Sequence, residues 1–137
     1  MPRHISILFP GQGSQHIGML DNLPTELVES FRGLALEALS FDIIDLINNG
    51  NEEDLNKTSI TQPAILLTSF IYFKHLQNSI NLKADLMCGH SLGEYSALVA
   101  SNSITLGDAL KLVYQRGLLM ERSHNGSMYA ILNTDID

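Results

Sequence analysis

One serine stands between two glycines, directly after a short apolar run, in the stretch Ala84-Asp85-Leu86-Met87-Cys88-Gly89-His90-Ser91-Leu92-Gly93-Glu94-Tyr95-Ser96-Ala97-Leu98-Val99-Ala100. The run Ala84–Cys88 predicts a short buried strand, and the residues after Ser91 predict a helix that ends near Ala100. A serine at such a strand-to-helix turn is typical of a nucleophile elbow. The turn holds its central residue at strained dihedral angles, and side chains at Gly89 and Gly93 would collide with their neighbours.

Two backbone N–H groups are candidates for stabilising an oxyanion beside this serine. The N–H of Leu92 lies at the start of the elbow helix, where helix geometry points it toward the serine hydroxyl. The other belongs to the loop Pro10-Gly11-Gln12-Gly13-Ser14-Gln15 that follows the strand candidate His4–Phe9. The two glycines around Gln12 allow a tight turn that presents N–H groups to a ligand. A plain glycine-rich connection would fit the same pattern.

Strand-like and helical patterns alternate along the rest of the chain, which predicts an α/β fold with a parallel sheet. The apolar segment Ala64–Leu76 predicts a buried central helix, with Pro63 in its first turn. The other expected elements are a helix over Thr25–Leu39, a short helix ended by Asn48-Asn49-Gly50, a helix from Thr105 or Asp108 to about Ser123, and a strand over Met128–Leu132.

Four segments carry a resemblance to a known family: Phe9-Pro10-Gly11-Gln12-Gly13-Ser14-Gln15, Thr61-Gln62-Pro63-Ala64, Gly89-His90-Ser91-Leu92-Gly93-Glu94-Tyr95-Ser96, and Gln115-Arg116-Gly117-Leu118-Leu119-Met120. In this order they resemble malonyl-CoA:acyl carrier protein transacylase and the acyltransferase domains of fatty-acid and polyketide synthases. The resemblance runs from Ile5 to about Leu132. It implies part of an α/β-hydrolase-like large subdomain over residues 1–125 and the start of a ferredoxin-like subdomain over residues 126–137, hence a fold incomplete at the C-terminus.

The resemblance also implies a role for several residues. Ser91 would carry the malonyl group as an ester, with Gln12 and Leu92 as oxyanion donors. Arg116 would bind the free malonyl carboxylate, for which a planar guanidinium is well suited. Gln62 and His90 would belong to the substrate site. On an elbow, however, consecutive side chains point apart, so the His90 imidazole is poorly placed to take the serine proton and a packing role is favoured.

The catalytic base is the part of this chemistry that the sequence does not supply. The chain has five histidines, and none of them matches the family's catalytic histidine, which lies in the later part of family members. Three interpretations therefore remain open. The chain is the N-terminal part of a malonyl transacylase, a serine acyl hydrolase or thioesterase, or a non-catalytic fragment or pseudoenzyme. An incomplete sheet would expose apolar surface, which predicts self-association or binding of a complementary C-terminal fragment.

Composition limits the partners. The 137 residues include 45% hydrophobic residues and carry a net charge of -7, which disfavours nucleic-acid binding and general attraction to membranes. Coenzyme A and acyl carrier protein are themselves anionic, so they would need a local basic patch. Its candidates are Lys83, Lys111, Arg116 and Arg122. No metal or cofactor is implied, because malonyl-CoA and the phosphopantetheine of the carrier protein would be substrates.

The single cysteine and the lack of a long apolar run bear on location. Cys88 permits no intrachain disulfide, which favours a reducing compartment, and its place in the strand predicts a small buried apolar side chain. The apolar stretch before Pro10 is too short for a signal peptide, and no run is long enough for a membrane span. We therefore expect a cytoplasmic protein.

Overall fold

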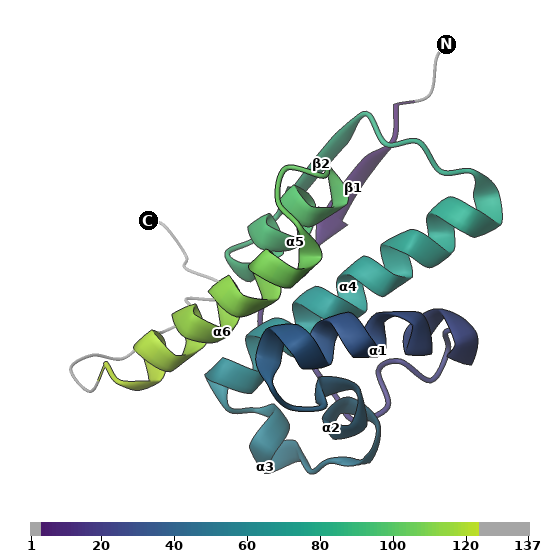
Figure 1. Cartoon of the computed structure of the whole chain (residues 1–137). Coiled ribbons are helices and arrows are strands. Elements are labelled where there is room, and N and C mark those ends of the chain that lie inside the picture. Colours follow the sequence, from purple (N-terminus) through teal and green to yellow (C-terminus); the bar gives the residue numbers. More distant parts are fainter. Residues whose placement is uncertain (1–3, 124–137) are drawn as a thin grey trace, which may run out of the picture.

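The computed structural model describes residues 4–123, which form a parallel pair of strands and six helices (Figure 1). The elements are β1 (Ser6–Phe9), α1 (Thr25–Leu39), α2 (Ile43–Asn49), α3 (Glu52–Leu55), α4 (Thr58–Ile80), β2 (Leu86–Gly89), α5 (Leu92–Ala100) and α6 (Leu106–Glu121). The predicted α/β class is confirmed. The single-turn helix α3 was not predicted, and the strand expected over Met128–Leu132 lies outside the described residues, as does the expected subdomain over residues 126–137.

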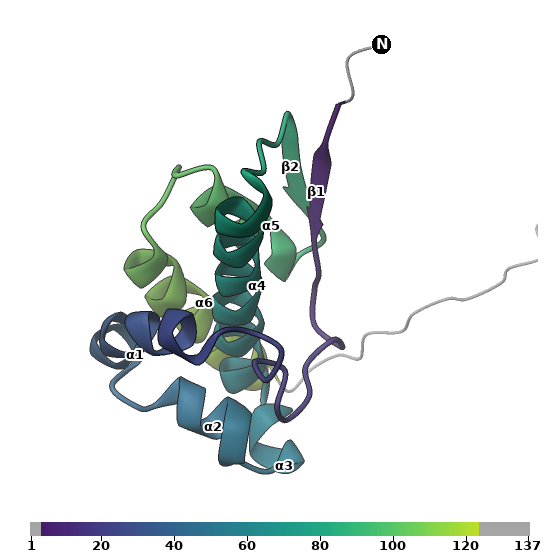
Figure 2. The ribbon, with the colours of Figure 1, turned by 90° about the vertical axis from the view of Figure 1, so that its right-hand side faces the viewer.

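The two strands run parallel in a register that pairs Ser6 with Leu86 and Phe9 with Gly89. Figure 2 shows α4, α5 and α6 on one side of the strands. Phe9 points to that side, where its ring packs edge-on against Phe73 of α4 with centroids 6.1 Å apart. The side chains that point the other way meet no covering layer among residues 4–123, and Leu8 is accordingly 77% exposed.

This bare face corrects two expectations. Leu86 is 57% exposed and Cys88 is only half-buried, although the sequence predicted a buried strand and a buried cysteine. Both residues lie on the same face as Leu8, because side chains alternate along a strand and the register pairs Leu8 with Cys88. A parallel sheet is normally covered on both faces, whereas residues 4–123 cover one. Self-association through this face stays a prediction.

Helix α4 is the centre of the fold, and every residue from 61 to 68 in it is buried. The predicted central helix is confirmed, but it begins at Thr58, so Pro63 lies in the second turn and not in the first. The reason is a contact distant in sequence. Glu121, at the end of α6, accepts a hydrogen bond from the backbone N–H of Ser59 (2.7 Å), which satisfies a donor in the first turn of α4.

Helix α6 packs across α4 at Gly117. A Cβ atom on this glycine would lie 2.4 Å from the Cα atom of Ser59, so any larger residue would push the two helices apart. The start of α6 is settled by its cap. The Thr105 hydroxyl accepts a hydrogen bond from the backbone N–H of Asp108 (3.1 Å), which makes Thr105 the N-cap. The crossing brings Arg116 of α6 next to Gln62 of α4.

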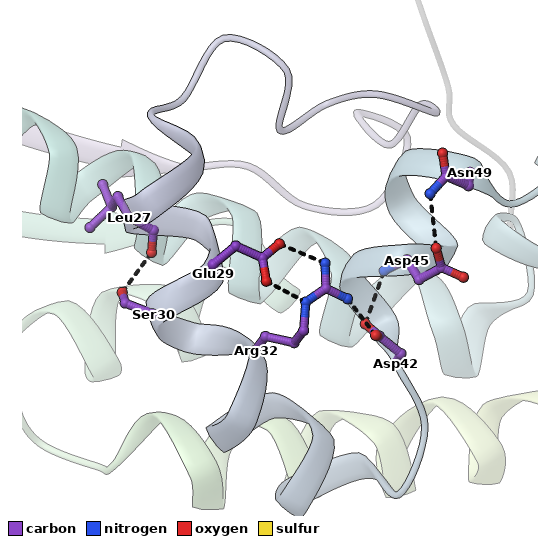
Figure 3. A network of polar contacts seen from close by, with 7 residues as sticks. All are labelled: Leu27, Glu29, Ser30, Arg32, Asp42, Asp45 and Asn49. Carbon is purple, nitrogen blue, oxygen red and sulfur yellow. Dashed lines mark hydrogen bonds and ion pairs between the residues drawn. The ribbon is translucent and has the colours of Figure 1, made fainter.

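The corner between α1 and α2 is held by an arginine between two carboxylates (Figure 3). Arg32 donates to both carboxylate oxygens of Glu29 (2.6 and 2.7 Å) and also to Asp42, the N-cap of α2. Burial opposes ionisation of Asp42, but hydrogen bonds from the Asp45 N–H and from Arg32 outweigh it and lower the pKa of Asp42. The hydrogen bond with Glu29 is the largest contribution that raises the pKa of Arg32.

Candidate active site

Ser91 lies at a sharp turn between β2 and α5, as the sequence predicted. Its backbone angles, φ 52° and ψ -103°, are rare for a residue other than glycine, and its side chain is exposed. The neighbouring backbones leave no space beside it. A Cβ atom on Gly89 would lie 2.1 Å from the carbonyl carbon of Gly93, and one on Gly93 would lie 2.3 Å from the carbonyl oxygen of Phe9. The elbow glycines therefore hold this strained serine in place.

The Gly11-Gln12-Gly13 loop packs directly on this elbow, because parallel pairing ends both strands at the same edge. A Cβ atom on Gly11 would lie 3.0 Å from the His90 carbonyl oxygen and 3.2 Å from its Nδ1 atom. Within residues 4–123, the N–H groups of Gln12 and Leu92 have no hydrogen-bond acceptor. These two donors are thus available to a ligand, and the His90 ring packs beside the loop.

The loop has a brace that the sequence analysis missed. The Gln15 side chain accepts a hydrogen bond from the Gly13 N–H (2.8 Å) and donates one to the Asn56 side chain (2.8 Å). The Gln15 side chain thereby connects the loop to the segment between α3 and α4. Gly13 itself adopts φ +106°, a conformation that favours glycine. The two glutamines of the loop segment therefore differ in their contacts, since Gln15 is bound within the fold and Gln12 is exposed.

Arg116 reaches the nucleophile candidate from α6. Its Nη2 atom lies 3.0 Å from Ser91 Oγ, and its Nη1 atom lies 2.7 Å from Gln62 Oε1. The guanidinium carbon also lies 5.8 Å from the ring centroid of Tyr95, one helical turn after Ser91. Three elements, α4, α5 and α6, thus converge on one half-buried guanidinium.

Gln62 lies behind this guanidinium and is fully buried, with 0% of its surface exposed. Its Nε2 atom donates to the sulfur of Met120 at 3.3 Å. The structure therefore brings the predicted residue into the site but places it against Arg116, away from solvent. Tyr95 and Met120 were missed as partners of the site. For Tyr95 the signal was its spacing of four residues from Ser91, which places it about one turn into the elbow helix that Ser91 caps.

The described residues offer no proton acceptor to Ser91. Its hydroxyl accepts a hydrogen bond from Arg116, and a guanidinium is a hydrogen-bond donor without an acceptor site. Within residues 4–123 no histidine or carboxylate is hydrogen-bonded to Ser91. The same residues contain no cluster of three His, Cys, Asp or Glu side chains able to hold a metal ion, and none of their helices is long and apolar enough to cross a membrane.

A groove runs along the exposed side of α6 beside Arg116 and is lined by Leu112, Gln115, Arg116, Leu119, Met120 and Ser123. Two of the predicted basic residues, Lys111 and Arg122, are exposed on the same helix or directly after it. Lys83 is also exposed, in the connection between α4 and β2. A joint role of these cations in binding an anionic partner stays a prediction.

Comparison with known proteins gives the family. The model of the acyl transferase domain family matches residues 7–137. The chain belongs to this family. It is 44% identical over 140 residues to the malonyl CoA-acyl carrier protein transacylase of Haemophilus influenzae, an alignment that covers 97% of this chain and 45% of that protein. The chain thus spans less than half the length of the curated relatives it matches.

Solved structures agree with this assignment. The malonyl CoA-acyl carrier protein transacylase from Coxiella burnetii superposes with a TM-score of 0.84 at 40% identity, over 89% of this chain and 39% of that one. A malonyl-transacylase in complex with its type II polyketide synthase acyl-carrier protein gives a TM-score of 0.82 at 44% identity, over 87% of this chain and 39% of that one. The resemblance found in the sequence and the α/β fold class are confirmed, whereas the division into subdomains at residue 125 stays a prediction.

Proposed function

We propose that this chain forms the serine-bearing part of a malonyl-CoA:acyl carrier protein transacylase. One observation carries the proposal: a guanidinium lies 3.0 Å from the hydroxyl of a serine held at a strained elbow. A malonyl ester on Ser91 would have its free carboxylate only one methylene away from the ester carbonyl. Arg116 is therefore well located to bind that carboxylate with charge-assisted hydrogen bonds.

The reaction would proceed in two transfers. In the first, Ser91 Oγ forms an ester with the malonyl carbonyl, the thioester bond breaks, and the serine proton leaves with the coenzyme A thiol. In the second, the phosphopantetheine thiol of acyl carrier protein takes the malonyl group and the serine hydroxyl is restored. The free N–H groups of Gln12 and Leu92 would stabilise the oxyanion in both steps. The names of the relatives support both substrates.

Covalent labelling tests the first transfer. The chain is incubated with malonyl-CoA, and the acyl-enzyme is followed by intact mass and located by peptide mapping. Because residues 4–123 place no base on Ser91, we expect slow acylation, on the order of a million-fold below a complete serine enzyme. Labelling should be absent in Ser91→Ala. Rapid multiple turnover by the 137-residue chain would contradict the expectation that Ser91 has no catalytic base.

Selectivity tests the role of Arg116. In Arg116→Ala, labelling by malonyl-CoA should fall about ten- to a hundredfold, the loss expected for a charge-assisted contact, while labelling by acetyl-CoA holds or rises. An unchanged malonyl preference would exclude the carboxylate role. An ester that reacts with water faster than with an added pantetheine thiol would favour a hydrolase, and failure of every acyl thioester to label Ser91 would favour a non-catalytic role.

A further inference from the structure

A guanidinium that binds a substrate carboxylate has to be fixed in place without pairing with a carboxylate of the protein, which would compensate its charge. We infer that Gln62 is the positioning residue that meets this need, and that it thereby sets the preference for acyl groups with a free carboxylate. The inference rests on the proposed function of Arg116 and adds to it a residue that does not itself touch the substrate. Gln62 is buried behind the guanidinium and contacts it at Nη1.

The orientation of the Gln62 amide follows from its two neighbours. Arg116 can only donate hydrogen bonds, and the thioether of Met120 can only accept them. The carbonyl oxygen of Gln62 must therefore face Arg116 and its NH₂ group must face Met120, which is the arrangement observed at 2.7 and 3.3 Å. Because Gln62 is fully buried, it has no water with which to exchange these contacts. The acceptor is thus preorganised for Nη1.

Arg32 shows what the alternative looks like. That arginine is paired with two carboxylates, Glu29 and Asp42, so its charge is compensated within the protein. By contrast, no carboxylate among residues 4–123 lies within ion-pair distance of Arg116. Its described partners are an amide, a hydroxyl and an aromatic ring, from Gln62, Ser91 and Tyr95. The charge of Arg116 therefore stays available to a ligand.

The two terminal nitrogens of the guanidinium, Nη1 and Nη2, also face different partners. Gln62 binds Nη1, whereas Nη2 points at Ser91, where an acyl group would be attached. A carboxylate can take the Nη2 side without breaking the bond to Gln62. The anchor consequently persists while Arg116 exchanges its contact with the serine hydroxyl for one with the substrate.

The test compares two substitutions that should lower the malonyl preference for different reasons. Gln62→Met keeps the length of the side chain but removes the acceptor, so Arg116 keeps its charge and loses its position. Gln62→Glu keeps an acceptor but adds a charge that compensates Arg116. The readout is the ratio of malonyl to acetyl labelling of Ser91 in the 137-residue chain. Because both labels report on the same folded molecules, partial unfolding of a variant cancels in this ratio.

We expect the ratio to fall about tenfold in Gln62→Met and further in Gln62→Glu, toward its value in Arg116→Ala. In the Arg116→Ala background neither substitution should change the ratio, because Gln62 acts only through that residue. Gln77→Met is the matched control on the same helix, since Gln77 contacts Lys74 and not the site. Its ratio should equal that of the unaltered chain.

A second measurement does not depend on acylation. Titration with malonate and with acetate, followed by the backbone amide NMR signals of Ser91 and Leu92, should show weaker malonate binding in Gln62→Met and still weaker binding in Gln62→Glu. If Arg116→Ala lowers malonate binding and the labelling ratio but the Gln62 variants change neither, the inference is wrong and the proposed function stands. If Arg116→Ala itself has no effect, the proposed role of Arg116 fails first.

Discussion

Two of the glycines that bring backbones into close contact differ in what surrounds them. Gly93 faces the carbonyl oxygen of Phe9, where a Cβ atom would approach to 2.3 Å, and Gly117 faces the Cα atom of Ser59, where it would approach to 2.4 Å. The first contact belongs to the serine elbow and the second to the crossing of α4 and α6. The nucleophile candidate is thus placed by one short motif packed on the neighbouring strand, whereas Arg116 is placed by the crossing of two helices.

The largest effect is expected at the elbow. In Gly93→Ala the new methyl group would overlap a backbone oxygen that cannot rotate away, so we expect the free energy of unfolding to fall by about 3 kcal/mol and Ser91 labelling to be lost. Chemical denaturation and intact mass measure the two effects.

Gly33→Ala is the control for this substitution. Gly33 lies in α1 with nothing within 4 Å of its would-be Cβ atom. Alanine there should raise the stability by about 0.5 to 1 kcal/mol, because it is the better helix former. Equal stabilities for the two variants would mean that the elbow has room for a side chain, contrary to the close contact.

The same contrast explains how far the sequence could predict this molecule. The elbow was predictable because the pattern around Ser91 needs both of its glycines at fixed spacing, and both contacts are within the motif or with the adjacent strand. The helix over Thr25–Leu39 was predicted with its bounds, since its apolar spacing is local.

Contacts between distant segments were not predictable. The sequence offered Gly117 as part of a segment that carries the family resemblance, but it could not show that the residue it meets is Ser59. For the same reason it could not show that Glu121 accepts a hydrogen bond from the backbone in the first turn of α4. The helix was therefore predicted to begin about one turn too late, with Pro63 in its first turn and not in its second. The exposed face of β2 was missed because an apolar strand does not reveal what covers it.

A smaller effect is expected at the helix crossing. In Gly117→Ala the two helices can separate slightly, so we expect a loss of about 1 to 2 kcal/mol in the free energy of unfolding. The shift should also move Arg116 relative to Gln62 and lower the ratio of malonyl to acetyl labelling. Gly107→Ala, on the same helix, is the control, since its Cβ atom would meet only a leucine methyl group at 3.9 Å. A ratio that is unchanged in Gly117→Ala would show that the crossing does not set the position of Arg116.

The smallest effect is expected at Asp42, far in sequence from both glycines. Asn also caps helices well, so Asp42→Asn keeps the acceptor for the Asp45 N–H and replaces the charged oxygen that pairs with Arg32 by an amide NH₂ group. Because the Asp42 side chain is 37% exposed, we expect a loss of only about 0.5 kcal/mol at neutral pH. The pKa of Asp42 is lowered in the folded chain, so its contribution is complete above the unfolded pKa of about 3.9 and is lost as the pH falls through the folded pKa. Denaturation curves of the two proteins should therefore differ at pH 7 and begin to converge as the pH falls below about 4, with the labelling ratio unchanged throughout. A difference in stability that persists in acid would mean that Asp42 acts through packing and not through its charge.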